Sequence, residues 1–254
     1  MSWTAIVLAG SRPGADPFAA KHGTDLKALI PVGGSPMVAR PVTALLHSSY
    51  IDRVRVLTQQ TARIAAVLPA DDRVSVEPSA ATIAVTLDAI LSDPATTYPL
   101  LITTADHALL NPAMIADFCV CAAGADVAIG LVERRSLMAR LPDTQRTWIK
   151  FRGGVYSGAN LFAFGSTKAA MAVALWRSVE QDRKKGWRMI AALGPAVLLG
   201  AILRVRTLDQ TLAAVGRKLG IAIRKVELTD PLAAVDVDKA ADHEIVTAIL
   251  EGRA

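Results

Sequence analysis

Short runs of β-branched and other apolar residues alternate along most of the chain with longer stretches whose apolar residues recur at helical spacing. The short runs predict strands at Trp3–Ala9, Arg53–Thr58, Arg73–Glu77, Pro99–Thr104 and Asp126–Val132. The longer stretches predict helices at Pro36–Ser48, Thr61–Leu68, Ala81–Leu91 and Pro112–Ala123. This alternation is typical of a parallel sheet covered by helices on both faces.

The pattern changes after residue 140. Two further strands, Thr147–Phe151 and Ser157–Phe164, surround a turn at Gly153–Gly154. The remaining elements that we predict are helices at Thr167–Gln181, Trp187–Leu199, Leu208–Leu219 and Ala240–Glu251, a strand at Ala222–Glu227 and a short one at Ala234–Val237. The chain shows no internal repeat and no long linker, so we expect one α/β domain over residues 1–254.

The composition of the chain indicates its expected cellular compartment and its association with membranes. The longest apolar stretch, Met189–Leu203, has about fifteen residues and contains Pro195, whereas a membrane span needs roughly 20. No signal peptide precedes the first strand. Cys119 and Cys121 lie two positions apart in a predicted helix, so we expect buried thiols rather than a disulfide or metal pair. These features favour a cytoplasmic protein without stable membrane insertion.

The net charge of +5 invites the hypothesis of a nucleic-acid partner. The basic residues are spread in small groups, however, and aromatic residues make up only 5%, too few for a stacking platform. A mild positive balance suits a small phosphorylated ligand equally well. We therefore expect no nucleic-acid partner; the sequence does not indicate an oligomeric state.

The loop after the first strand is the first candidate site, because ligands of open parallel sheets bind beyond the carboxyl ends of the strands. It begins at Leu8 and contains Ala9, Gly10, Ser11 and Arg12, and Lys27 follows further on. Small residues let backbone N–H groups approach a phosphate, and the basic side chains supply charge. The loop matches neither the dinucleotide fingerprint nor a Walker A motif. The alternative is an ordinary turn followed by a surface lysine.

This segment resembles the signature L-A-G-G-x-x-x-R…K-x-L-x-x-x-x-G-x-P-M of MobA-like and other GT-A-type nucleotidyltransferases. The resemblance implies a Rossmann-like αβα sandwich with a mostly parallel sheet. It also implies that the loop backbone and Arg12 hold the triphosphate of an NTP, while Lys27 stabilises charge on the α-phosphate. Ser11 stands where the family has a second glycine, and the stretch from Arg12 to Lys27 is longer than usual. Ser79 lies in the place of the base-binding loop but without its glycines, so the nucleobase stays open, with CTP and GTP favoured.

Two acidic positions suggest a metal site. Asp106 directly follows the fourth strand, and Mg²⁺ prefers one or two carboxylates together with phosphate oxygens and waters. The family resemblance makes Asp106 a metal ligand, and the segment Val235–Asp242 resembles the V-D-V-D-T-P-E-D close of the family. We predict Asp236 as the second ligand and Asp238 as a helix N-cap; the alternative is that both cap. His107 is predicted to be a surface or satisfied residue rather than a general base.

The acceptor side is predicted from the strand–turn–strand region, which resembles a G-(G/A/I)-N motif that lines the acceptor pocket of MobA-like relatives. The predicted acceptor-binding residues are Lys150, Tyr156, Gly158 and Asn160, with Arg183 and Lys184 as a clamp for the acceptor phosphate. The alternatives are a solvated hairpin face and a solvated helix end.

Taken together, these features predict a Mg²⁺-dependent nucleotidyltransferase that joins NMP from an NTP to a small phosphorylated acceptor and releases pyrophosphate. Residues 1–135 would bind the NTP, and residues 136–254 would form the acceptor side with extra helices. Arg12, Lys27 and Asp106 are the predicted catalytic residues. Two alternatives stay open. One is a GT-A glycosyltransferase, although the Asp-x-Asp pattern lies near the C-terminus; the other is a non-catalytic nucleotide-binding homologue.

Overall fold

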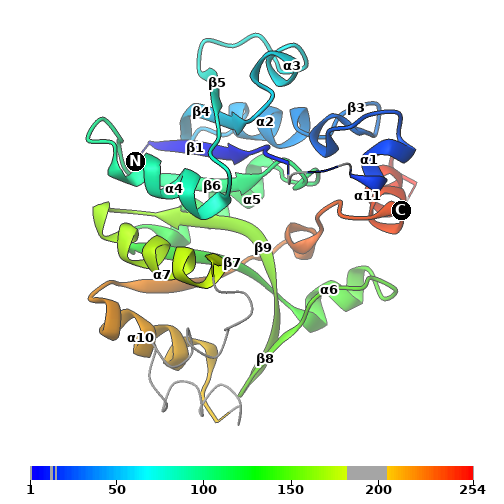
Figure 1. Cartoon of the computed structure of the whole chain (residues 1–254). Coiled ribbons are helices and arrows are strands. Elements are labelled where there is room, and N and C mark those ends of the chain that lie inside the picture. Colours follow the sequence, from blue (N-terminus) through cyan, green and yellow to red (C-terminus); the bar gives the residue numbers. More distant parts are fainter. Residues whose placement is uncertain (1, 12–13, 15, 182–204, 254) are drawn as a thin grey trace.

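The structure of the protein is a computed structural model that describes residues 2–11, 14, 16–181 and 205–253. In this part of the chain, one eight-stranded sheet forms the centre of the molecule (Figure 1). Its strands are β1 Trp3–Leu8, β4 Ile51–Thr58, β5 Val74–Pro78, β6 Leu100–Thr104, β7 Val127–Glu133, β8 Ile149–Phe151, β9 Gly154–Phe164 and β10 Ile223–Glu227. A separate hairpin joins β2, Pro31–Val32, to β3, Ser35–Pro36.

The strand order is β10-β7-β9-β6-β1-β4-β5, and β8 pairs with β9. Strand β1 pairs in parallel with both β4 and β6, and β4 pairs in parallel with β5. Strand β10 is parallel to β7, whereas β9 is antiparallel to β6, β7 and β8. The carboxyl ends of β1, β4, β5 and β6 therefore meet at one edge of the sheet, which is where ligands bind in such folds.

Helices cover both faces of this sheet. They are α1 Pro17–Lys21, α2 Ala39–Leu46, α3 Thr61–Ala65, α4 Ile83–Ser92, α5 Pro112–Ala122, α6 Arg134–Arg140, α7 Ala170–Gln181, α10 Leu208–Leu219 and α11 Ala240–Leu250. Three short 3₁₀ turns are η1 Lys27–Leu29, η2 Thr167–Ala169 and η4 Pro231–Ala234.

Alternation of side chains along the strands divides the core into two layers. Ala5 and Val7 of β1 belong to the cluster that contains Phe118 of α5, whereas Ile6 belongs to the cluster that contains Leu87 of α4. Successive strand residues point to opposite faces, so each strand contributes to both layers. The predicted αβα sandwich with a mostly parallel sheet is confirmed.

Local capping explains most of the helix boundaries. The Asn111 side chain accepts a hydrogen bond from the backbone N–H of Met114 at 2.9 Å, and Pro112 occupies the first position of α5. Helix α2 begins at Ala39 rather than at Pro36, because Ser35 and Pro36 pair with β2 in the hairpin.

Several predicted elements need correction. The strand predicted at Ala234–Val237 is wrong, since this stretch is the end of η4 followed by an extended segment outside the sheet. Cys119 is buried as expected, but Cys121 is exposed. The helices α1 and α6 were not predicted. The helix predicted at Trp187–Leu199 lies outside the described residues, as does the apolar stretch Met189–Leu203. Among the helices that the structure describes, none combines the length and the hydropathy of a membrane span.

Gly130 of β7 allows a close approach of β9, and this contact generates a stability prediction. A Cβ atom on Gly130 would lie 3.0 Å from Cβ of Leu161 and 3.1 Å from its carbonyl oxygen, opposite an irregularity in the β7–β9 register. We expect Gly130→Ala to lower the free energy of unfolding by about 1–3 kcal/mol through overpacking. Gly158→Ala is the matched control, because a Cβ atom there meets nothing within 4 Å. Equal stability of the two variants in chemical denaturation would contradict this packing argument.

Candidate active site

The loop that follows β1 and begins at Leu8, here called the opening loop, starts at the carboxyl edge of the sheet. Contacts with neighbouring residues fix it there. The backbone N–H of Ala9 donates to the carbonyl oxygen of Leu57 at 2.9 Å, and that of Ser11 donates to Oε1 of Gln59 at 2.9 Å. Gly10 lies against Gln59, because a Cβ atom on Gly10 would be 3.2 Å from the Gln59 amide. The predicted loop residues Leu8 to Ser11 are thus at the expected edge, whereas Arg12 lies outside the described residues.

Lys27 lies at the same edge of the sheet as the opening loop. Asp16 caps α1 through hydrogen bonds from the backbone of Phe18 and Ala19, and η1 then begins at Lys27. Helix α1 lies beside α11 at this end of the sheet (Figure 1), and the rings of His22 and His243 are 4.5 Å apart. Helix α1 and the adjacent His22 are therefore packed against the C-terminal helix α11.

The Lys27 ammonium group contacts two carboxylates. Its Nζ atom lies 2.6 Å from Oδ2 of Asp106 and 2.5 Å from Oδ1 of Asp238. Asp106 lies two residues beyond Thr104, the last residue of β6, and the Thr104 hydroxyl donates a hydrogen bond to its other carboxylate oxygen. The backbone N–H of Val237 donates to the carbonyl oxygen of Asp106 at 3.0 Å and so joins the C-terminal acidic segment to the end of β6. Sequence positions 27, 106 and 238 thereby converge on one point.

Burial and charge act in opposite directions on these groups. Burial by itself raises the pKa of the Asp106 carboxyl, but the Lys27 ammonium group and the Thr104 hydroxyl outweigh it and hold the pKa below its ordinary value. Burial by itself lowers the pKa of Lys27, and the carboxylates of Asp106 and Asp238 hold it above its ordinary value. Lys27 and Asp106 are therefore an ionised pair at neutral pH.

Asp236 has a different environment. Its side chain accepts hydrogen bonds from the Arg146 guanidinium group and, at 3.1 Å, from Nδ2 of Asn160. Burial raises the pKa of the Asp236 carboxyl, and the nearby charges of Asp238 and Asp106 raise it further, against the lowering effect of Arg146. The three acidic side chains Asp106, Asp236 and Asp238 are thus close enough to influence one another.

The predicted role of Asp238 as a helix N-cap is wrong. Lys239 is the N-cap residue of α11 and makes no capping hydrogen bond with its side chain. Instead, a side chain of the helix bonds to the backbone that precedes it: Oδ2 of Asp242 accepts a hydrogen bond from the backbone N–H of Asp238 at 3.2 Å. The Asp238 side chain is left to contact Lys27 and remains 63% exposed.

Asn160 owes its position to an irregular backbone. It has a φ angle of 48°, in the left-handed region that asparagine adopts more readily than most residues. It lies where the register between β7 and β9 shifts. This backbone turn directs the Asn160 amide to Asp236, and Gly158 is exposed on the same strand.

Of the other predicted acceptor residues, the described Lys150 and Tyr156 lie in surroundings of their own. Lys150 is exposed on β8, and Tyr156 is buried against Leu131 and Leu208 with Lys225 over its ring. Arg183 and Lys184 lie outside the described residues. The acceptor roles of these four residues stay predictions.

Ser79 lies close to the opening loop, as predicted for a nucleotide-binding residue. A Cβ atom on Gly10 would be 3.4 Å from its hydroxyl oxygen, and the backbone N–H of Ser79 donates to the carbonyl oxygen of Thr58 at 3.0 Å. The hydroxyl itself is buried and has no hydrogen-bond partner among the residues that the structure describes. Gln59, whose amide contacts Ser11 and the carbonyl oxygen of Ala80, joins the two loops.

His107 lies behind Asp106 and not on the surface. Its ring is fully buried, and Nδ1 is 3.2 Å from Oγ1 of Thr103. Burial lowers the pKa of His107 to about 4, so the imidazole is neutral at neutral pH. The prediction of a surface position for His107 is therefore wrong.

Arg146 and Gln59 were missed by the sequence analysis. Arg146 lies in the polar loop between α6 and β8, and nothing in the local pattern of that loop indicates its contacts. Gln59 follows β4 at the carboxyl edge, so the rule that pointed to Asp106 could also have pointed to Gln59.

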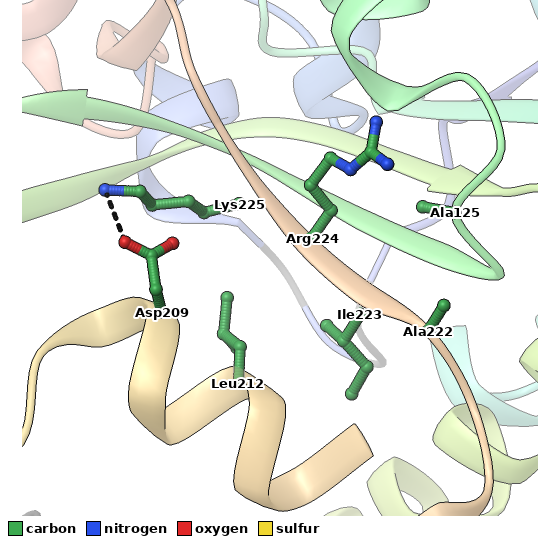
Figure 2. A pocket seen from close by; sticks show the side chains of 7 residues that line it. All are labelled: Ala125, Asp209, Leu212, Ala222, Ile223, Arg224 and Lys225. Carbon is green, nitrogen blue, oxygen red and sulfur yellow. Dashed lines mark ion pairs between the residues drawn. The ribbon is translucent and has the colours of Figure 1, made fainter. Parts of the chain in front are cut away.

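A separate cavity of about 230 Å³ opens at the other side of the sheet, between α10 and the edge strand β10 (Figure 2). The ion pair between Asp209 and Lys225 closes one end of it at 3.2 Å. None of the predicted site residues that the structure describes lines this cavity. The candidate active site is therefore the cluster around Lys27 and not this pocket.

The αβα sandwich with its opening loop at the carboxyl edge of the sheet is the architecture of nucleotidyltransferases. The chain belongs to the family of the MobA-like NTP transferase domain, whose family model matches residues 5–219. It is therefore a nucleotidyltransferase. A comparison with curated proteins gives no match.

Solved structures agree with this assignment. A structure described as a hypothetical transferase from Thermus thermophilus has a TM-score of 0.81 and 27% identity, covering 96% of this chain and 100% of that one. The 4-diphosphocytidyl-2C-methyl-D-erythritol synthase from Anaerococcus prevotii has a TM-score of 0.60 and 12% identity, covering 98% and 96%. A nucleotidyl transferase from Methanothermobacter has a TM-score of 0.58 and 17% identity, covering 100% and 99%. The last two show similarity of fold alone.

The raised pKa of Asp236 generates a prediction on stability. The folded protein binds a proton at Asp236 more readily than the unfolded chain does, so ionised Asp236 lowers stability above its folded pKa. We expect Asp236→Asn, without added metal, to have a higher melting temperature than the wild type at pH 7. The gain should disappear on acidification below about pH 4, because the wild-type carboxyl is then protonated as well.

Asp126→Asn is the matched control. Ser166 and the backbone N–H of Ala222 donate to the Asp126 carboxylate, and the pKa of this carboxyl is lowered, first by the bond from Ala222. Asp126→Asn should therefore lose stability at pH 7, with the opposite sign. A lower melting temperature for Asp236→Asn at pH 7 would contradict this electrostatic assignment.

Proposed function

We propose that the protein transfers NMP from an NTP, with CTP or GTP favoured, to a small phosphorylated acceptor in a Mg²⁺-dependent reaction that releases pyrophosphate. The observation that carries this proposal is the double contact of Lys27 with Asp106 and Asp238. The ammonium group of Lys27, from the long connection after β1, faces carboxylates from two other segments at the carboxyl edge of the sheet. A triphosphate and a metal ion need these two kinds of group on opposite sides.

The carboxylate side chains of the site are suited to a Mg²⁺ ion that is also bound by the phosphates of a nucleotide. Among the described residues, no three His, Cys, Asp or Glu side chains are arranged to hold a metal ion by themselves. Mg²⁺ commonly needs only one or two carboxylates, because substrate phosphates and waters complete its coordination. Asp106 would supply one carboxylate and Asp236 the second, with Asp238 as the alternative. The ion would neutralise negative charge on the transferred phosphoryl group.

The reaction requires no protein base. An oxygen of the acceptor phosphate, ionised at neutral pH, forms a bond to the α-phosphorus, and the bond to the bridging oxygen of pyrophosphate breaks. The electron pair leaves with pyrophosphate. Lys27, released from its carboxylates, would stabilise the charge on the α-phosphate, and the opening loop from Leu8 to Arg12 would bind the β- and γ-phosphates.

The acceptor would bind on the side of Asn160. The side-chain amide of Asn160 lies 3.1 Å from Asp236 and can also donate to an oxygen of the acceptor substrate. The exposed Gly158 leaves room beside this amide. Lys150, Tyr156, Arg183 and Lys184 belong to the same proposal as groups that would bind the acceptor and its phosphate.

The direct test is a screen of the purified protein with Mg²⁺ and each NTP against phosphorylated sugars, alditols, inositols and cofactor precursors. We expect pyrophosphate release with one pair, and a fall of about 10²–10³-fold in kcat for Lys27→Ala and for Asp106→Ala. Lys21→Ala, which changes an exposed lysine of α1, is the control and should keep full activity. Turnover of a nucleotide sugar with no pyrophosphate from any pair, or full activity in Lys27→Ala, would contradict the proposal.

Ser79 offers a second test, because its two expected effects have opposite signs. A buried hydroxyl without a partner costs stability, so Ser79→Ala should leave the free protein equally stable or more stable. If the nucleotide supplies the missing partner, the same variant should bind NTP about 3–10-fold more weakly, which corresponds to one lost hydrogen bond of about 1 kcal/mol. Ser75→Ala removes the hydrogen bond to Glu77 and should leave nucleotide affinity unchanged. Unchanged affinity in Ser79→Ala, measured by calorimetry, would exclude Ser79 from the nucleotide site.

A further inference from the structure

Arg146 contacts the C-terminal acidic segment at Asp236 and at Asp242. Its guanidinium group contacts the Asp236 carboxylate, lies 3.3 Å from the carbonyl oxygen of Asp236 and lies 3.0 Å from Oδ1 of Asp242. The side chains of Arg146 and Asp242 are only 7% and 5% exposed. The pair is thus buried beneath the acidic segment and is not offered to the solvent.

The Asp242 carboxylate links Arg146 to the backbone of Asp238. While Oδ1 accepts from Arg146, Oδ2 accepts the backbone N–H of Asp238. The ion pair of Arg146 and Asp242 therefore contacts this segment at both ends, at Asp236 and at the backbone of Asp238. Between them, the backbone N–H of Val237 donates to the carbonyl oxygen of Asp106.

We propose that Arg146 and Asp242 are positioning residues for nucleotidyl transfer, which fix the carboxylates of Asp236 and Asp238 relative to Asp106. This inference rests on the proposed function, because the carboxylates are positioned for a metal–nucleotide complex. The planar guanidinium fork presents its N–H donors in a fixed geometry to two carboxylates and a carbonyl oxygen, whereas a lysine ammonium group on its flexible stem does not fix their relative orientation. Outer partners that orient metal ligands commonly change metal affinity by about 10–100-fold when they are removed.

Positioning and simple charge predict opposite results for Arg146→Met. The substitution removes a positive charge from beside the carboxylates, so electrostatics alone would strengthen Mg²⁺ binding. If Arg146 acts by holding the carboxylates in place, Mg²⁺ binding weakens despite the extra negative charge. The direction of the change therefore separates the two accounts.

The experiment compares the Kd of a non-hydrolysable NTP analogue in EDTA with its Kd in Mg²⁺, by calorimetry. The ratio of the two values is the enhancement by Mg²⁺, and each variant serves as its own reference. We expect the enhancement to fall about 10–100-fold in Arg146→Met and by less in Arg146→Lys. Asp242→Asn, which retains one acceptor oxygen for two donors, should show a fall as well. Arg55→Met is the matched control, because it removes a guanidinium–carboxylate pair with Glu77 between β4 and β5 and should keep the wild-type enhancement.

An unchanged or larger enhancement in folded Arg146→Met would overturn the inference. Should thermal melting show that this variant is unfolded, Arg146→Lys and Asp242→Asn decide in its place, and wild-type enhancement in both would overturn the inference. A wild-type protein without any enhancement by Mg²⁺ would remove both the proposed metal and the inference. The expected falls without pyrophosphate release from any acceptor would leave the inference standing and contradict the proposed transfer.

Discussion

The contact of one lysine with two carboxylates defines the candidate active site of this molecule. Lys27 comes from the long connection after β1, Asp106 from the loop after β6 and Asp238 from the segment that precedes the last helix. The parallel strands set the place where these segments meet, since their carboxyl ends lie at one edge. The packing of α1 against α11 and the bond between Val237 and Asp106 keep the segments together.

The charges of this cluster do not balance. The side chains in contact with one another include four carboxylates and two cations, namely Asp106, Asp236, Asp238, Asp242, Lys27 and Arg146. A partly buried cluster with excess negative charge is unfavourable in the free protein, and the raised pKa of Asp236 reflects this burial and the repulsion from its neighbours. Binding of a divalent cation would relieve that repulsion. The cost to stability is then part of what prepares the site for its ligand.

Much of the fold could be predicted because its signals are local. Apolar runs predicted the strands, and the predicted helix that begins at Pro112 is present, with Asn111 as its N-cap. The pair Asp16–Pro17 carries the same kind of signal and could have revealed α1. The alternation of Val235, Asp236 and Val237 suggested a strand, but these residues join no ladder, since Val237 bonds only to the loop after β6. The alternation of apolar and polar residues alone does not show whether a neighbouring strand is present.

The site was predictable to the extent that sheet geometry or family resemblance applied. The position of Asp106 follows from the end of an apolar strand, and Lys27 came from the family signature. The partner of Lys27 at Asp238 and the network of Arg146 depend on contacts across 211 and 90 residues of sequence. Such contacts leave no periodic pattern in the chain, and a polar loop residue such as Arg146 looks like any solvated arginine until the fold is known.

We propose that Lys27 and the carboxylates face each other across the place where a triphosphate and a metal ion bind. A crystal structure of the protein with Mn²⁺ and a non-hydrolysable NTP analogue is the most direct test, because Mn²⁺ can be located by its anomalous scattering. We expect the metal between Asp106 and the carboxylates of the C-terminal segment, with Lys27 moved from them to the α-phosphate. An analogue bound elsewhere, or bound here with Lys27 still paired to both Asp106 and Asp238, would contradict it.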